Sequence, residues 1–323
     1  MNTMIPSAPV GRIRILLERE FWEHKGGFFW APVVTAGLVL LISVMAAVWA
    51  SVKRRGDTWG IKQGDPAEVQ EALGAAGDMA MLSGVGITSL VLGFVVFFYA
   101  LGSLYDDRKD RSVLFWKSMP VSDTATVASK AVWAALLGPL AAVLIGLALG
   151  LGLWLLGLAT TSVNGISGAS GILTHSHPFQ VMATILALLP VYALWALPTI
   201  GWLMLCSAAA PSKPFLWALI IPVMGCAIIT MVSSMLNLGF EVKSLWYVVA
   251  IRPLLSVFPM TFLASVNERV DQVQIDGPGD IHRLFDAVQS TQLLASVDLW
   301  VGAAIGLVMI VAATRLRRWR DEG

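Results

Sequence analysis

The residues that could carry out chemistry in this chain are few and scattered. His175 and His177 form an isolated H-S-H pair, whereas a metal site needs three or four ligands, and no other His, Cys or carboxylate lies near them in the sequence. No GxxxxGK[ST], HExxH or CxxC pattern occurs. The glycine- and serine-rich run from Gly165 to Gly171 meets neither a serine-hydrolase nor a phosphate-loop spacing and has the composition of a linker. We therefore expect no catalytic, cofactor-binding or metal-binding residue and no enzyme activity in this chain alone.

The composition is that of an integral membrane protein. The 323 residues are 57% hydrophobic and 13% charged, with a mean hydropathy of +0.74, whereas a soluble domain carries about 25% charged residues. The formal net charge of +1 implies no bulk attraction to nucleic acid. Cys206 and Cys226 both lie inside apolar runs, which favours packing roles over a disulfide or a metal pair. No small-residue cleavage site follows the first apolar run, so we expect a retained span rather than a signal peptide.

Six runs of about twenty largely apolar residues predict six membrane-spanning helices in a single transmembrane domain, residues 1–323. The runs lie near residues 28–50, 80–104, 131–159, 180–208, 213–236 and 296–315. No Asp, Glu, Lys, Arg or His falls near the middle of any of these runs, although ion-coupled transporters and pumps usually need such groups. A cavity lined in this way would suit an amphipathic or lipid-like substrate, and the energy for any transport would have to come from elsewhere.

Residues 10–25, ahead of the first span, have the spacing of an amphipathic helix. Ile13, Leu16, Leu17 and Phe21 fall on one face, with charged residues mostly elsewhere. Such a helix suits the membrane surface, although an ordinary solvated helix has the same pattern. Aromatic residues cluster where this helix meets the first span, as interfacial aromatics do, and favour the membrane-surface interpretation.

The distribution of Lys and Arg predicts the orientation. The N-terminal tail, the 105–130 loop, the 209–213 turn and the C-terminal tail together hold 14 Lys and Arg residues, and the opposite loops hold eight. Because the side richer in Lys and Arg is normally cytoplasmic, we expect both termini in the cytoplasm, with a local violation at Lys53, Arg54 and Arg55.

The long loop at residues 237–295 should be external and contains an apolar stretch at 245–262. Pro253 and Pro259 interrupt this stretch, and Arg252 lies near its middle. We therefore expect two short re-entrant helices that dip into the outer leaflet rather than a seventh span, because a broken backbone at membrane depth must be covered by protein or water. The residues of interest in this external segment are Trp246, Tyr247, Arg252, Pro253 and Pro259.

The 105–130 loop is a long charged and aromatic segment between two apolar runs. It opens with the charged residues Asp106, Asp107, Arg108 and Lys109. Further on, Pro120 should end one helix, while Ser122 as N-cap and Asp123 in the first turn should begin the next. The loop is either simply solvated or a surface that another protein covers, and its buriable aromatics favour the covered surface. The residues predicted to form that surface are Phe115, Trp116, Lys117, Ser118, Met119, Pro120, Val121, Ser122 and Asp123.

This loop resembles bacterial ABC-transporter permeases of the type-2 exporter class. Such permeases commonly carry the run L-Y-x-[DE]-R-x-x-x-[ST]-x-x-F-[WL]-x-S-x-P-V-S at this place. The pattern is met by Leu104, Tyr105, Asp107, Arg108, Ser112, Phe115, Trp116, Ser118, Pro120, Val121 and Ser122. The match is local and dense, and the rest of the chain agrees in layout.

The resemblance implies an all-α permease that works with other chains in the bacterial cytoplasmic (inner) membrane. Two copies of a separate cytoplasmic ATPase would bind ATP and Mg²⁺, and a second permease chain, identical or paralogous, would complete the membrane unit. The loop would dock on the ATPase as a coupling helix at about residues 115–128, and the re-entrant pair would close the outer end of the pathway. The alternative is a membrane scaffold or sensor subunit that is coupled to a cytoplasmic partner and transports nothing.

Overall fold

The computed structural model describes residues 9–56, 66–110, 122–166, 168–236, 242–259, 261, 294 and 296–320. Within these residues the protein is helical and contains no strand. Six helices are long and apolar enough to cross a membrane, as the sequence predicts.

The helices follow one another with few breaks. A π-helical turn, marked η, joins α1 to α2, α6 to α7 and α11 to α12, so each of these pairs forms one continuous helical run. The elements are α1 (Pro9–Lys25), η1 (Gly26–Trp30), α2 (Ala31–Gly56), α3 (Pro66–Gly102), α4 (Tyr105–Lys109), α6 (Asp123–Val132), η2 (Trp133–Leu137), α7 (Gly138–Val163), α8 (Gly171–Thr174), α9 (Pro178–Ala209), α10 (Pro214–Leu236), α11 (Val242–Trp246), η3 (Tyr247–Ile251), α12 (Arg252–Leu255) and α15 (Val297–Arg320).

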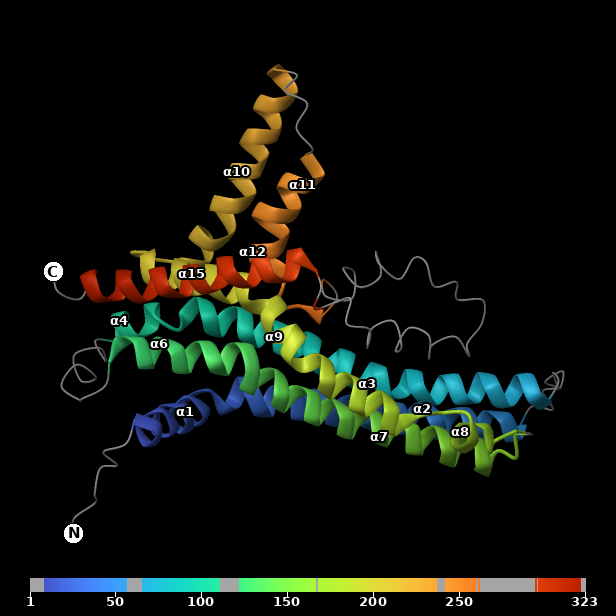
Figure 1. Cartoon of the computed structure of the whole chain (residues 1–323). Helices are drawn as coiled ribbons and strands as arrows, with labels where there is room; N and C mark the ends of the chain where they lie inside the picture. Colours follow the sequence, from blue (N-terminus) through green and yellow to red (C-terminus); the bar gives the residue numbers. More distant parts are fainter. Residues whose placement is uncertain are drawn as a thin grey trace, which may run out of the picture.

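The helices α3, α7 and α9 form the middle of an elongated bundle, with α15 in the half that holds the termini and α2 in the other half (Figure 1). The helix α3 packs along α7, and α9 packs along α15. Glycines allow these close approaches, because a Cβ at Gly84 would collide with the backbone of Gly146 and Gly150, and one at Gly306 would collide with Leu197. Small residues at helix contacts are the usual way in which membrane helices gain close packing.

The two ends of the described chain lie at the same end of the bundle. Figure 1 shows the beginning of α1 and the end of α15 at one end, on opposite sides of α4 and α6, with α8 at the far end. The short helix α4, the beginning of α6 and the end of α9 lie at the same end as the termini (Figure 1). This arrangement brings together the positively charged segments that the sequence assigns to the cytoplasmic side.

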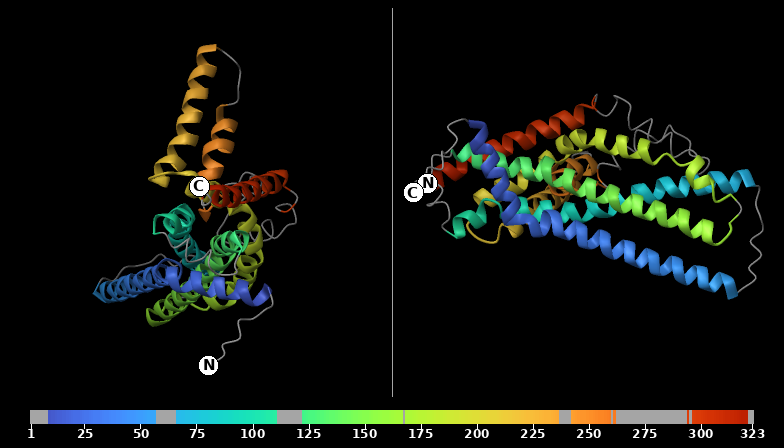
Figure 2. Two further views of the ribbon diagram at one scale, coloured as in Figure 1. Left: turned by 90° about the vertical axis from the view of Figure 1, so that its left-hand side faces the viewer. Right: turned by 90° about the horizontal axis from the view of Figure 1, so that it is seen from below.

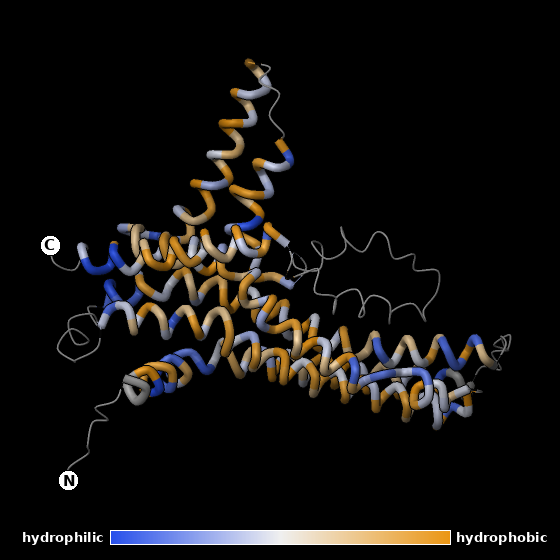
Figure 3. The backbone as a smooth tube through the Cα atoms, in the orientation of Figure 1, coloured by the Kyte–Doolittle hydropathy of each residue, from blue (hydrophilic) through white to orange (hydrophobic). Residues whose placement is uncertain are grey.

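The helix α10 leaves the bundle at a steep angle, and the α11–η3–α12 run returns beside it (Figures 1 and 2). We call these two runs the α10 arm. Figure 3 shows that α10 is apolar along most of its length. Large apolar side chains on it are exposed, among them Met231 at 59% and Met235 at 77%. The arm therefore presents an apolar surface to the surroundings of this chain.

The apolar face predicted for residues 10–25 is used for packing within the chain. Leu16 is buried, and the indole Nε1 of Trp133 in η2 donates a hydrogen bond of 2.8 Å to the carbonyl oxygen of Leu17. The ring of Phe21 stacks on Trp133 with a centroid distance of 5.8 Å. Only Ile13 of the four predicted positions is exposed. The helix is present, and its position at a membrane surface stays a prediction.

The predicted break at Pro253 is not found. The chain stays helical from Val242 through Pro253 and turns only after Leu255. Pro253 therefore lies inside a continuous helical run, directly after the π-helical turn η3. Pro259 is described, but most of the continuation of the predicted re-entrant pair lies outside the described residues.

Candidate functional site

A buried carboxylate on α1 is the centre of the polar cluster at the termini end of the bundle. Glu20 is 1% exposed. Its Oε2 accepts a hydrogen bond of 2.7 Å from the hydroxyl of Tyr99 on α3, and its Oε1 lies 3.2 Å from Nζ of Lys130 on α6. A buried charge is costly unless it is paired and hydrogen-bonded, and Glu20 meets both conditions.

From Lys130, at the end of the 105–130 loop, the ion pairs continue to Asp107 near the beginning of this loop. The Nζ atom of Lys130 lies 3.5 Å from Oδ1 of Asp107 on α4, and Oδ2 of Asp107 lies 3.3 Å from Nη1 of Arg317 on α15. The Nε atom of Arg317 lies 3.7 Å from Oδ1 of Asp123 in the first turn of α6. We call Glu20, Lys130, Asp107, Arg317 and Asp123, together with Tyr99, the charge network. It joins α1, α3, α4, α6 and α15.

The beginning of the loop is also fixed to the end of α9. The hydroxyl oxygen of Ser207 accepts hydrogen bonds from the backbone N–H groups of Leu104 and Tyr105, at 3.0 and 2.9 Å. The guanidinium of Arg108 donates to the carbonyl oxygens of Ser207 and Ala210, at 2.6 and 3.1 Å. These carbonyls lie in the last turn of α9 and at its C-cap residue, where the helix's acceptors need partners from outside the helix. The predicted loop residue Arg108 therefore has a structural role.

The end of the loop begins α6 with the cap that the sequence predicts. Ser122 has an extended backbone, and its Oγ accepts a hydrogen bond of 3.2 Å from the N–H of Ala125. Asp123 occupies the first turn, where the helix dipole favours a negative charge. The other predicted docking residues, Phe115, Trp116, Lys117, Ser118, Met119, Pro120 and Val121, lie outside the described residues.

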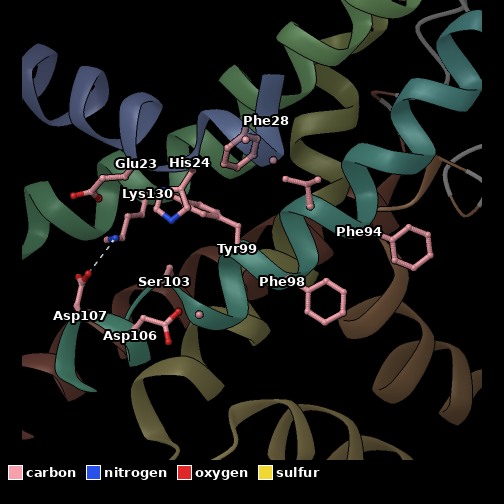
Figure 4. A pocket seen from close by; sticks show the side chains of 14 residues that line it. Glu23, His24, Phe28, Phe94, Phe98, Tyr99, Ser103, Asp106, Asp107 and Lys130 are labelled. Carbon is pink, nitrogen blue, oxygen red and sulfur yellow. Dashed lines mark ion pairs between the residues drawn. The ribbon is translucent and has the colours of Figure 1, made fainter. Parts of the chain in front are cut away.

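An open groove of about 540 Å³ lies beside the charge network, between the end of α1 with η1 and the end of α3 with α4. Figure 4 shows its two ends, one lined by charged and polar side chains and the other by phenylalanines. We call it the interfacial groove. Its polar lining is Glu23, His24, Ser103, Asp106, Asp107 and Lys130, and its apolar lining is Phe28, Phe94, Val95, Phe98 and Tyr99.

Three side chains at the edge of this groove could in principle hold a metal ion. Ligand atoms of Glu20, Glu23 and His24 lie within 4.8 Å of one another. However, both carboxylate oxygens of Glu20 are already engaged, one by the hydroxyl of Tyr99 and the other by Lys130. An ammonium at 3.2 Å already balances the negative charge that would attract a cation. These residues therefore fit an ion-pair network better than a metal centre.

A second polar cluster lies where the α10 arm meets the bundle. The guanidinium of Arg252, in a side chain only 6% exposed, donates a hydrogen bond of 2.7 Å to the carbonyl oxygen of Asp298 and lies 3.8 Å from the ring centroid of Trp195. Tyr247 donates to Asp298 Oδ2 at 3.1 Å. The predicted external residues Tyr247 and Arg252 are thus brought together against α9 and α15.

The other predicted residues of this segment lie close by. Pro253 lies with Arg252 on the wall of an apolar cavity of about 450 Å³. The indole Nε1 of Trp246 donates a hydrogen bond of 3.1 Å to Oγ1 of Thr230 on α10.

The sequence interpretation treated the two histidines as plain loop residues. In the structure the backbone N–H of His177, at the beginning of α9, donates a hydrogen bond of 2.8 Å to Oδ1 of Asp78 on α3. Asp78 is fully buried. A carboxylate beside the first turn of a helix is favoured by the free N–H groups and the dipole there, so this contact anchors α9 to α3.

Sequence reasoning missed four members of the charge network, namely Glu20, Tyr99, Lys130 and Arg317. A signal for Glu20 was present, because it follows Leu16 by four residues and so lies on the apolar face of α1. Nothing comparable marks Arg317, one of four arginines in a basic C-terminal segment.

Comparison of the chain with protein-family models, with curated proteins and with solved structures gives no match.

Proposed function

We propose that this chain is the permease subunit of an ATP-driven exporter that resembles the type-2 ABC class. Its substrate would be an amphipathic, lipid-like or peptide-like compound. A separate cytoplasmic ATPase, present in two copies, would bind ATP and Mg²⁺, and a second permease chain would complete the complex. The protein would lie in the bacterial cytoplasmic membrane with both termini inside.

The observation that best supports this proposal is that the described residues on both sides of 111–121, within the 105–130 loop, are fixed to the bundle. On one side, Asp107 and Arg108 of α4 contact Arg317 of α15 and the last turn of α9. On the other side, Lys130 of α6 pairs with Glu20 of α1. A force applied to the loop would therefore move the ends of four long helical runs together, as a coupling element requires.

Alternating access would follow from such a movement. Closure of the ATPase dimer would push the loop, and the helices joined through the charge network would tilt together. The two states would differ in their contacts with the ATPase, and this difference would shift the population from an inward-open to an outward-open form. The Arg252–Asp298–Trp195 contacts would hold the α10 arm against α9 and α15 in one of the two states.

The exposed apolar surface of the α10 arm supports the proposal that a second permease chain is present. Met231 and Met235 on α10 are well exposed, and Figure 1 shows the arm standing away from the rest of the bundle. A partner chain would cover the side of α10 that the described residues leave exposed. The partner would be either a second copy of this chain or a paralogue.

The charge network also fits the second candidate function, a scaffold or sensor that transmits force without transport, because rigid coupling needs no substrate.

The deciding experiment purifies the tagged chain from its native membrane in mild detergent and assays ATPase activity in the eluate. Exporter function predicts a co-purified ATPase, activity abolished by vanadate, and ATP-dependent movement of a compound in vesicles. An ATPase that co-purifies without any transport would favour the sensor, and a chain that comes down alone and inactive in several detergents would contradict both coupled functions.

A further inference from the structure

The interfacial groove has the shape and lining of a site for an amphipathic small molecule. Its volume of about 540 Å³ lies within the roughly 300–1,000 Å³ range of ligand pockets. Phe94 and Phe98 on α3 are 54% and 58% exposed, so their rings are open to contact from outside. Figure 4 shows these rings on the side of the groove away from the carboxylates. A ligand there would meet apolar rings with one end and charged groups with the other.

The charged end of the groove has an excess of negative charge. Asp107 and Lys130 face it but pair with each other and with Arg317 and Glu20, so their charges are largely balanced within the charge network. Two further carboxylates, those of Glu23 and Asp106, also line the groove. Glu23 pairs with Arg19, whereas no described residue forms an ion pair with Asp106. The negative charge of Asp106 thus gives the groove a local preference for a cation.

The backbone around Asp106 leaves room for its carboxylate and for a ligand. A Cβ at Gly102 would collide with Oδ2 of Asp106, so glycine at this position lets the acid lie over the end of α3. Gly26 in η1 lines the opposite wall, and a Cβ placed there would meet no atom within 4 Å. The two glycines therefore widen the groove where the charged and apolar linings meet.

We propose that the interfacial groove binds a lipophilic monovalent cation, such as an organic ammonium or phosphonium compound. The cationic centre lies toward Asp106 and Glu23, and the apolar body packs against Phe94 and Phe98, whose ring faces also attract a cation. Anionic amphiphiles of the same shape are disfavoured, because they would place a negative charge beside the carboxylate of Asp106. This inference goes beyond the proposed function, because binding requires neither ATP nor a partner chain.

The test measures equilibrium binding of radiolabelled tetraphenylphosphonium to the purified full chain in nanodiscs of zwitterionic lipid. Tetraphenylborate, which has nearly the same size and shape but the opposite charge, is the matched probe, and empty nanodiscs correct for partition into lipid. We expect saturable binding of tetraphenylphosphonium and none of tetraphenylborate. Equal saturable binding of both ions would overturn the role of the carboxylates, and the absence of saturable phosphonium binding would overturn the site.

Substitutions locate the site. Asp106→Asn is expected to weaken phosphonium binding roughly fivefold, the size expected for a partly exposed charge pair. Gly26→Leu should fill the groove and abolish binding, and because Gly26 faces open space the variant is expected to fold. Glu18→Gln, which removes an exposed acid on α1 outside the groove, is the control and should bind like the wild type. Wild-type affinity in both Asp106→Asn and Gly26→Leu would show that the cation binds elsewhere.

Discussion

The ammonium of Lys130 lies 3.2 Å from the carboxylate of Glu20 in a pair whose two side chains are each only 2% exposed. The pair joins α6 to α1 across 110 residues of sequence, and Asp107 extends it to α4 and α15. Because water is largely excluded, removal of Lys130 would leave the Glu20 carboxylate with only the hydroxyl of Tyr99 and the more distant imidazole of His24, at 3.8 Å. The pair therefore acts as a structural link that can be broken selectively.

We expect Lys130→Met to destabilise the protein by about 3–5 kcal/mol, because it leaves Glu20 as an uncompensated buried charge. Thermal unfolding in detergent measures the effect. The double variant Glu20→Gln with Lys130→Met should recover part of the loss, since it removes both charges of the pair and leaves Asp107 paired with Arg317. Arg14→Met is the matched control: its pair with Glu18 has side chains 81% and 56% exposed and should contribute almost nothing. Equal stability of Lys130→Met and the wild type would show that the pair is not a link.

The contact between α3 and α7 gives a second prediction, in which two glycines of the same helix behave differently. Gly84→Ala should destabilise the fold by roughly 1–3 kcal/mol, because its Cβ would collide with the backbone of Gly150 and the helices would have to separate. Gly86→Ala, two residues away, meets no atom within 4 Å and should be neutral or stabilising by up to about 1 kcal/mol. Comparison of the two unfolding temperatures tests the packing, and a similar loss in both variants would contradict it.

Periodicity and composition were enough to predict the helical class and the six long apolar helices, because each span is a local property of about twenty residues. The π-helical junctions and the direction of α10 could not be predicted, since they depend on which helices pack together. The charge network has the same limitation. Glu20 and Lys130 are far apart in the sequence, and only the folded chain brings them within 3.2 Å. Phe115 and Trp116, which carry the predicted docking surface, lie outside the described residues.

The docking prediction can therefore be tested only by experiment. Replacing both Phe115 and Trp116 by Ala should weaken co-purification of the ATPase by at least tenfold, because large aromatic residues most often anchor interfaces. The permease itself should still insert in the membrane. Trp49→Ala is the control, since Trp49 is an exposed tryptophan, at 65%, near the end of α2 that lies away from the loop. Unchanged co-purification of the ATPase with the double variant would contradict the assignment of this surface.

Binding of tetraphenylphosphonium should depend on pH through Asp106, which lies in α4 beyond the end of α3. Partial burial raises the pKa of the Asp106 carboxyl above its usual value, and the negative charge of the nearby Asp110 raises it further. Because the charged form attracts the cation, affinity should be full above this raised pKa and fall as the pH falls through it. The positive charges of Lys109 and Lys130 act in the opposite direction on the pKa, but burial is the larger effect.

Other groups around Asp106 also titrate or carry charge, namely Asp107 beside it in α4 and, across the groove, Glu23 and His24. The variant Asp106→Asn separates the contributions, because it removes only the Asp106 part. We expect a shallower pH dependence in this variant than in the wild type. Identical profiles would show that Asp106 does not contact the cation.

The α10 arm gives the last prediction, which concerns the partner chain. Met231 on α10 and Met45 on α2 are similarly exposed, at 59% and 64%, so both would be covered only by lipid if the chain worked alone. The native cysteines, Cys206 and Cys226, are buried and should not react. A partner that covers the arm predicts that Met231→Cys, but not Met45→Cys, forms a cross-linked product of about twice the chain mass in native membranes.

Mass spectrometry of that product identifies the partner. Peptides from this chain alone would indicate a second copy, and peptides from a different membrane protein would indicate a paralogue. A thiol-reactive dye should label both variants in detergent, which controls for accessibility of the introduced cysteines. If Met231→Cys is labelled but never cross-linked, or if both variants cross-link equally, α10 does not form the contact. The apolar surface of the arm would then be in contact with lipid.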